Sequence, residues 1–419
     1  MAKIDPQAPA VVRGIQTIGV GRQGSKALTP ALAVEIVGEL AKGATDPVTA
    51  GAFWGALAAK GIMAGEEALA AAWPAGTLSD PQRWAEQVSG DAPASVRAIC
   101  ADLIRGDTLG RPRAVELGRF LFGDAPGEMA RGFIASLLRV RYETDDELVG
   151  LLTAMDETLA DPFRTAVPAG APVCQIAEPF DGTTRSYLVT PLIAAQALEE
   201  GYRPVVLVGR ESPGPKFGLG LAAIYGHLDG RFATSNAALG DEPPALGWVI
   251  DQADLAPAVQ AWVERRRRTK KRPFLATLEK FLDPARADLL IASAFHPGYT
   301  EKMGMLAETA GFPSAIIMRR GVEGTLTPNT GRPIEALCTA RGADGGYRRE
   351  RFEWTAAELL PGSLERRERN IASPTPEENA LRIDQYRRSG SSGDALFDEH
   401  VALSRAMLAR CLAWIRQQR

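Results

Sequence analysis

Apolar residues recur three or four positions apart through the N-terminal part of the chain. Between Leu28 and Trp73 this spacing is interrupted near Gly43 and Gly61 and predicts three short helices. A Thr29-Pro30 pair, suited to the N-cap and first turn of a helix, marks where the first of them begins.

The same pattern returns about 80 residues later. The matched pairs are Ala33 and Ala114, Gly43 and Gly123, Ala50 and Ala130, Phe53 and Phe133, Leu57 and Leu137, and Glu67 and Glu147. Repetition at a fixed spacing indicates a duplicated unit, here 28–73 and 107–158 within an all-helical domain spanning 28–160. Two unrelated amphipathic stretches are the alternative. A unit of about 45 residues buries too little surface to be stable alone, so we expect the copies to pack together or one to mediate self-association.

The pattern changes after Pro162, where short β-type runs alternate with helical segments. This alternation predicts an α/β domain over 168–370 with a mostly parallel central sheet, followed by a C-terminal linker and helix over 371–419. The predicted strands are 173–177, 205–208, 246–250, 289–292 and 315–318.

The first 27 residues contain a formal GxGxxG at Gly19, Gly21 and Gly24. A dinucleotide site requires a strand before the glycines and a helix opening at the last one, but here the helix signal starts at Thr29. A flexible arm over 1–27 is the favoured interpretation, and a nucleotide loop is the alternative.

Composition narrows the possible chemistry. The chain has 419 residues, 45% of them hydrophobic and 24% charged, which suits two or three globular domains. The absence of an apolar run long enough to span a membrane and of a secretory signal predicts a cytoplasmic protein with no membrane partner. Four scattered cysteines and three histidines predict neither a disulfide framework nor a metal site, and no cofactor is expected.

Positive charge is concentrated in one segment, the basic run, which holds seven cations in eight positions. The net charge of the whole chain is -3, so the remainder is distinctly acidic. Clustered cations bind polyanions through phosphate contacts without reading bases, which predicts a nucleic-acid site here. The alternative is a solvated turn that balances nearby acids. The run comprises Arg265, Arg266, Arg267, Arg268, Lys270, Lys271 and Arg272.

Several motifs resemble those of a known family. The Leu28-Thr29-Pro30 opening and the Ala-x-x-Phe-x-x-Ala-Leu helix ending at Lys60-Gly61 resemble the helical domain of anthranilate phosphoribosyltransferase and its glycosyltransferase family 3 relatives. The stretch 207–218 aligns with the family's KHGNRSVSSKSG and keeps its two glycines, one serine and the second of its two lysines, while Leu207 stands in place of the first. The resemblance covers 28 to about 328, and it implies the fold predicted above.

Other family motifs are altered. Where the family has a GTGGD phosphate loop, this chain has Glu178-Pro179-Phe180 before Asp181-Gly182, which should place a carboxylate beside the phosphate position. Leu326-Thr327 stands where the family has an Asp-Glu metal pair. The resemblance therefore implies a vestigial donor pocket and no catalytic residues. Its members are Asp181, Gly182, Thr183, Thr190, Gly209, Arg210, Ser212, Lys216, His296 and Glu323.

Three segments resemble a DNA-binding, non-catalytic paralogue of the same family: 180–192, 293–299 and 321–324. This resemblance implies a homodimer formed through the helical domains, and it supports a protein that binds nucleic acid without sequence preference. Two alternatives stay open. One is a ribosyl or phosphoribosyl transferase with an unknown acceptor, the only case requiring Mg, and the other is a regulatory small-molecule sensor.

Overall fold

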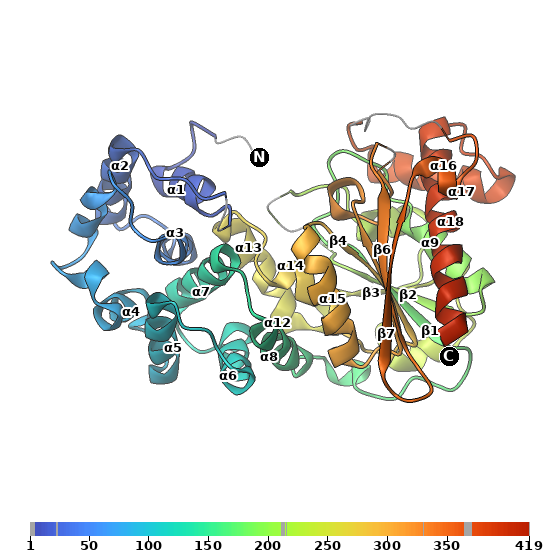
Figure 1. Cartoon of the computed structure of the whole chain (residues 1–419), viewed down its shortest axis with the longest axis horizontal. Helices are drawn as coiled ribbons and strands as arrows, with labels where there is room; N and C mark the ends of the chain where they lie inside the picture. Colours follow the sequence, from blue (N-terminus) through green and yellow to red (C-terminus); the bar gives the residue numbers. More distant parts are fainter. Residues whose placement is uncertain are drawn as a thin grey trace. The chain divides into compact units, whose positions relative to one another are not determined.

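The structure is a computed structural model that describes residues 5–21, 24–210, 214, 216–329, 331–363 and 371–418. The chain forms two compact units (Figure 1). Unit 1 comprises Met1–Glu157 and Ala261–Leu278, and unit 2 comprises Thr158–Gln260 and Glu279–Arg419. The segment 261–278, which holds the basic run, belongs to the helical unit and not to the α/β domain in which the sequence placed it.

Unit 1 is helical throughout its regular structure. Its longer helices are α1 (Ala10–Ile18), α2 (Pro30–Ala41), α3 (Pro47–Lys60), α4 (Pro81–Ser89), α5 (Ala94–Arg105), α6 (Arg111–Phe122), α7 (Glu128–Arg141), α8 (Asp145–Asp156) and α13 (Trp262–Thr269). Short helical turns are η1 (Glu67–Ala72), η2 (Thr77–Ser79) and α14 (Leu275–Leu278). The prediction of a flexible arm over 1–27 is wrong for the part that forms α1. This helix packs on α2 and α3, and its Val11, Ile15 and Ile18 are fully buried.

The duplication predicted from sequence is present as two matching sets of contacts. The bounds of α2 and α3 recur 81 residues later as those of α6 and α7. In the first copy, Glu66 accepts a hydrogen bond from the Leu28 amide at 2.7 Å and pairs with Lys60 at 2.7 Å. In the second copy, Glu147 accepts from the Leu109 amide at 3.0 Å and pairs with Arg141 at 2.6 Å. Glu66, one residue before the predicted Glu67, is therefore the counterpart of Glu147.

The two copies pack directly against each other through α3 and α7. A Cβ atom on Gly51 would lie 2.0 Å from the Met129 carbonyl oxygen, and one on Gly132 would lie 2.1 Å from that of Val48. Gly51 and Gly132 are equivalent positions, as are Val48 and Met129, so the contact is reciprocal. The two backbones approach closely because these glycines lack side chains. The expectation that the copies pack together is confirmed.

Unit 2 is built on a seven-stranded sheet in the order β3-β2-β1-β4-β5-β6-β7. The first five strands run parallel, and β6 and β7 extend the sheet antiparallel. The α/β fold with a mostly parallel sheet is confirmed, and all five predicted strands are present, whereas β6 and β7 were not predicted. The strands are β1 (Val173–Ala177), β2 (Arg203–Val208), β3 (Trp248–Asp251), β4 (Leu289–Ala294), β5 (Ser314–Arg319), β6 (Ile334–Arg341) and β7 (Tyr347–Trp354).

Helices cover both faces of this sheet (Figure 1). Helix α15 (Pro297–Ala310) packs on β4, β5 and β6, while α9 (Thr190–Glu199) and the C-terminal α18 (Ala395–Gln418) pack together on the other face. The C-terminal segment predicted over 371–419 as a linker and one helix contains two helices, α17 (Pro376–Ser389) and α18, with residues 390–394 between them. The remaining helices are η3 (Asp161–Phe163), α10 (Leu221–His227), η4 (Asn236–Gly240), α11 (Gln252–Leu255), α12 (Pro257–Gln260), η5 (Glu279–Phe281), η6 (Val322–Gly324) and α16 (Ala356–Leu359).

The strand order places a change of direction at the centre of the sheet. The chain leaves β1 for β2 on one side, and it later enters β4 on the other side of β1. In open parallel sheets, ligands bind beyond the carboxyl ends of the strands at such a point.

Among the described residues, no helix has the length and hydropathy that a membrane span requires.

Candidate functional site

Loops that follow β1 and β2 join at the carboxyl edge of the sheet. The Thr183 amide donates to the Leu219 carbonyl at 3.1 Å and the Leu219 amide returns a bond to Thr183 at 2.8 Å, while the Gly218 amide donates to the Asp181 carbonyl at 3.1 Å. Gly182 has φ 66°, and a Cβ atom there would lie 2.0 Å from the Leu219 oxygen. Glycine at 182 is therefore required for this close approach.

Glu323, in the turn after β5, occupies the centre of this arrangement. Its Oε2 accepts hydrogen bonds from the Thr183 hydroxyl at 2.8 Å and the Thr184 amide at 2.6 Å, and its Oε1 accepts from the Thr184 hydroxyl at 3.0 Å. Lys216 Nζ lies 3.5 Å from Oε2, and Arg185 Nε lies 3.8 Å from Oε1. Partial burial disfavours the ionised form, but the Thr184 amide, Lys216 and the two hydroxyls outweigh it and lower the pKa of Glu323.

Lys216 links the same loops through their backbones. Its ammonium donates to the Gly182 carbonyl at 2.9 Å and to the Glu323 carbonyl at 3.1 Å. Three of the predicted pocket residues, Thr183, Lys216 and Glu323, are thus in direct contact, and Gly182 and Asp181 form the loop beneath them.

Glu178 and Thr190 face the interior of unit 2. The Glu178 carboxylate is buried and accepts hydrogen bonds from the Thr190 hydroxyl at 2.6 Å and the Leu326 amide at 2.9 Å. Burial raises the pKa of Glu178. The carboxylate that was expected beside a phosphate position is thus bonded within the protein, where it stabilises the junction of β1, α9 and the 326 turn. Thr327, in the predicted metal position, donates instead to the Tyr187 carbonyl at 2.9 Å.

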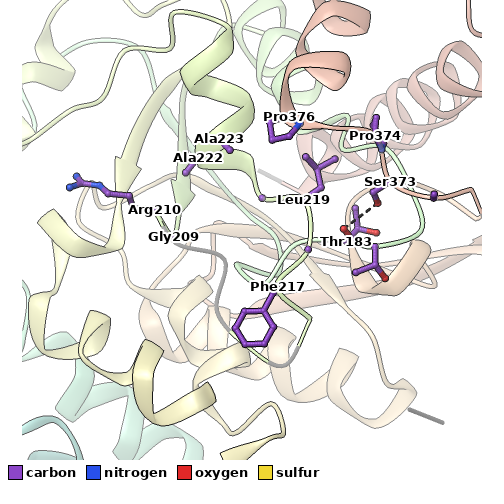
Figure 2. Close-up of a pocket in the computed structure, with 14 residues that line it drawn as sticks. Thr183, Gly209, Arg210, Phe217, Leu219, Ala222, Ala223, Ser373, Pro374 and Pro376 are labelled. Carbon is purple, nitrogen blue, oxygen red and sulfur yellow. Dashed lines mark hydrogen bonds between the residues drawn. The ribbon is translucent and has the colours of Figure 1, made fainter. Parts of the chain in front are cut away.

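A cavity of about 450 Å³ opens beside the two threonines (Figure 2). Its lining includes Thr183, Thr184, Gly209, Phe217 and Ser373, with small apolar residues at the start of α10. Phe217 is exposed and has φ 51°, so a large apolar ring stands at the rim. The cavity therefore combines a polar loop with an apolar wall, as small-molecule sites commonly do.

Ser373 comes from the C-terminal segment and was not predicted. Its hydroxyl is within hydrogen-bonding distance of the Thr183 carbonyl at 3.1 Å and the Ser186 carbonyl at 2.8 Å, and it accepts from the Ser186 amide at 3.1 Å. The Ser373 amide donates to the Thr184 carbonyl at 3.2 Å. Ser373 thus holds the 183–186 loop in place from nearly 190 positions away along the chain.

Of the other predicted pocket residues, Gly209 and Arg210 are among the residues that line the cavity, and His296 is not. The guanidinium of Arg210 points away from the other lining residues in Figure 2 and pairs with Asp251 at 2.6 Å and Asp254 at 3.2 Å. His296 is the N-cap residue of α15, is exposed, and has its ring 4.9 Å from that of the neighbouring Phe295. Ser212 lies outside the described residues.

The basic run is extensively paired within unit 1. Arg265 makes two hydrogen bonds to Glu128 at 2.6 and 2.9 Å, Arg267 pairs with Glu264 at 2.5 Å, and Arg268 pairs with Asp46 at 3.0 Å. Arg266 is only 1% exposed. The prediction that Arg266 contacts phosphate is therefore wrong for this fold, because its side chain lies inside the protein.

The end of the basic run leaves helical geometry. Helix α13 ends at Thr269, and Lys270 adopts φ 58°, so Lys270, Lys271 and Arg272 lie beyond the helix. Burial, reinforced by nearby Arg139, lowers the pKa of Lys271 to about 8. Arg272 is half-buried.

Comparison with known proteins identifies the fold. No known family model matches the chain. It is 24% identical over 238 residues to an uncharacterised protein of Aquifex aeolicus strain VF5, a match covering 56% of this chain and 69% of that protein. Similar solved structures include anthranilate phosphoribosyltransferase from Thermus thermophilus, with 19% identity, a TM-score of 0.55, and coverage of 77% of this chain and 100% of that one.

The Saccharomyces cerevisiae anthranilate phosphoribosyltransferase, solved in complex with PRPP and Mg, is 13% identical with a TM-score of 0.51. That match covers 81% of this chain and 88% of the yeast chain. The protein therefore has an anthranilate phosphoribosyltransferase-like fold, as the sequence resemblance implied. At these identities the likeness extends to the fold alone.

Proposed function

We propose that this protein binds a small phosphorylated ligand at the carboxyl edge of the unit 2 sheet. One observation carries the proposal: a backbone amide, two hydroxyls and an ammonium converge on a single anion, the Glu323 carboxylate. Backbone amides in loops together with a lysine are the groups that proteins use to hold phosphate. The adjacent cavity has room for the rest of a small molecule.

The residues around this site do not fit the Mg that accompanies PRPP in the yeast relative. Among the described residues, no group of three or more histidine, cysteine, aspartate or glutamate side chains is placed to hold a metal ion. Glu323 is engaged by neutral and cationic donors, while Leu326 is buried and Thr327 bonds to backbone. We therefore propose ligand binding with ordinary phosphoribosyl transfer lost, so that the protein acts as a sensor or carrier.

A titration by calorimetry with pyrophosphate, ribose 5-phosphate and PRPP, each without added metal, tests ligand binding. Lys216→Met should weaken binding of the tightest of these by about tenfold or more, because it removes a charge-assisted contact. Lys42→Met, which removes an exposed lysine from unit 1, is the matched control and should leave affinity unchanged. Equal affinities for wild type and Lys216→Met would place the ligand elsewhere.

Anthranilate phosphoribosyltransferase activity gives the first prediction. With anthranilate, PRPP and Mg, we expect phosphoribosyl anthranilate to form far more slowly than the roughly 1 per second of ordinary enzymes. The physical reason is that each lost electrostatic contact to a transferring group costs on the order of 10²- to 10³-fold in rate. Fluorescence detection of anthranilate consumption measures this, and turnover near 1 per second would overturn the proposed loss of transfer.

Nucleic-acid binding by unit 1 is a second candidate. The observation in its favour is a local excess of positive charge: the basic run places seven cations in eight positions of a chain whose net charge is -3. Such an excess attracts polyanions over a range set by salt. The salt-dependent titration argued in the Discussion tests this candidate.

A further inference from the structure

The groups around Glu323 form an anion site that the chain fills with its own carboxylate. All three hydrogen-bond donors to this carboxylate come from Thr183 and Thr184, in the loop after β1, and the nearest cation, Lys216, comes from the loop after β2. Both loops lie where open parallel sheets hold ligands. A carboxylate and a phosphate are interchangeable for such donors, because both present charged oxygens as acceptors.

The backbone of Glu323 has an unfavourable conformation within a fixed turn. Glu323 has φ 53° and ψ 18°, in the left-handed region that residues with side chains rarely adopt. The turn itself is fixed, since the Ser293 hydroxyl donates to the Gly324 carbonyl at 2.7 Å. The carboxylate, not the backbone, is therefore the part that is able to leave the site, by rotation of the side chain.

An alternative partner for the carboxylate is close by. Arg185 Nε lies 3.8 Å from Oε1, and its side chain is 62% exposed compared with 17% for Glu323. Thr184 is also exposed, so the donors can be reached from solvent. A rotation of Glu323 towards Arg185 would keep its charge paired while freeing the two threonines and Lys216.

We propose that Glu323 is a built-in competitor for the phosphate group of the ligand. This inference rests on the proposed function and adds its regulation: a phosphorylated ligand binds by displacing the Glu323 carboxylate, so the wild-type site is self-occluded. The purely structural interpretation, in which Glu323 only ties the β1 and β5 loops together, predicts the opposite result on mutation. Removal of the side chain would then loosen both loops and weaken any binding.

Calorimetric titration of wild type, Glu323→Ala and Glu323→Gln with pyrophosphate distinguishes the competitor from the purely structural role of Glu323. We expect Glu323→Ala to bind pyrophosphate at least tenfold more tightly than wild type, with Glu323→Gln in between because it keeps the shape but loses the charge. Adding Lys216→Met to Glu323→Ala should abolish the gain. Glu242→Ala, which removes an exposed carboxylate from unit 2, controls for net charge and should leave affinity at the wild-type value.

The outcomes separate this inference from the proposed function. Tighter binding by Glu323→Ala supports the competitor. If Glu323→Ala binds but wild type binds none of the three probes, the proposed function is overturned for the wild-type protein and the competitor stands. If wild type binds and neither variant binds more tightly, the competitor is wrong and the proposed function stands. If no form binds, both are overturned. Melting temperatures confirm that each variant is folded, and Glu323→Gln decides the question should Glu323→Ala unfold.

Discussion

Glu178 and Glu323 show how position decides what a carboxylate does. Both lie near the carboxyl edge of one sheet, yet burial raises the pKa of Glu178, whereas the Thr184 amide, Lys216 and two hydroxyls outweigh partial burial and lower that of Glu323. Glu178 is therefore a structural acceptor in the interior. Glu323 is a partly buried carboxylate held by Thr183 and Thr184, two residues that line the cavity.

His400 gives a residue-scale prediction about pH. It is buried on α18 with its ring 6.4 Å from that of Tyr187, and burial, opposed by Asp394, lowers its pKa to about 4. An unfolded histidine titrates near 6.5, so the unfolded state binds more protons between these values. The stability contributed by neutral His400 is complete above pH 6.5 and is lost as pH falls towards 4, by about 3 kcal/mol in total.

Thermal unfolding of the His400→Leu variant between pH 7 and 4 measures this effect. We expect its melting temperature to fall less steeply with acidification than that of wild type, because one proton uptake on unfolding has been removed. His227→Gln, at an exposed histidine on α10, is the control and should follow wild type. Identical slopes for wild type and His400→Leu would show that His400 is not the titrating group.

Sequence reasoning named several residues of the site but could not orient them. Asp181, Gly182, Thr183, Lys216 and Glu323 were all identified, and the structure brings them together. Side-chain direction depends on partners far away in the sequence: Thr183 and Glu323 are 140 positions apart. Ser373 lay beyond the stretch that resembles a known family, so no signal pointed to it.

At the scale of elements, the five parallel strands were predicted from their apolar runs, whereas the antiparallel β6, which is also largely buried, and β7 were not. Strand β7 carries alternating arginines and glutamates and is mostly exposed at the sheet edge, a composition that protects edges but resembles a charged loop in sequence. Helix α1 was also missed, because its Gly14 is typical of a break in a helix. In the structure a Cβ atom at this position would lie 2.9 Å from Ile36 and Phe53, so the glycine allows close tertiary packing.

The basic run gives the element-scale prediction. If unit 1 binds nucleic acid, the contacts must come from side chains that solvent can reach. Arg268 is exposed, and Lys270 and Arg272 are half-buried. Changing these three to alanine should flatten the slope of log affinity for duplex DNA against log salt by about two to three units, since each phosphate contact contributes about 0.9. Fluorescence anisotropy over a salt series measures the slope.

A matched control removes three exposed arginines from unit 2, Arg348, Arg351 and Arg388, and should leave the slope unchanged. Equal slopes for wild type and the basic-run variant would exclude the run as the contact surface. Equal flattening by both triple variants would instead indicate a diffuse response to net charge.

At the scale of the whole molecule, the duplication has a consequence for assembly. The glycine-lined face of α7 is covered by α3 of the same chain, and the contact is reciprocal, as in a symmetric pair of subunits. A homodimer through the helical domains, as the family resemblance implied, would need a different surface from this one. We infer that the first copy covers the α7 face within one chain, as a second subunit covers the equivalent face in a symmetric dimer.

Deletion of residues 1–90 tests this inference and is the last prediction. Without α1 to α4, the α7 face around Gly132 and Ser136 loses its partner helix, and a close-packing apolar surface of this kind associates with a second copy of itself. Mass measured by light scattering should therefore rise with concentration for the truncated chain, and its melting temperature should fall below that of the full chain. Gly132→Leu in the truncated chain should suppress the association, because a side chain there prevents the close approach of two backbones. A truncated protein that stays monomeric and melts like the full chain would mean that the first copy is an appended module, with no part in stabilising α7.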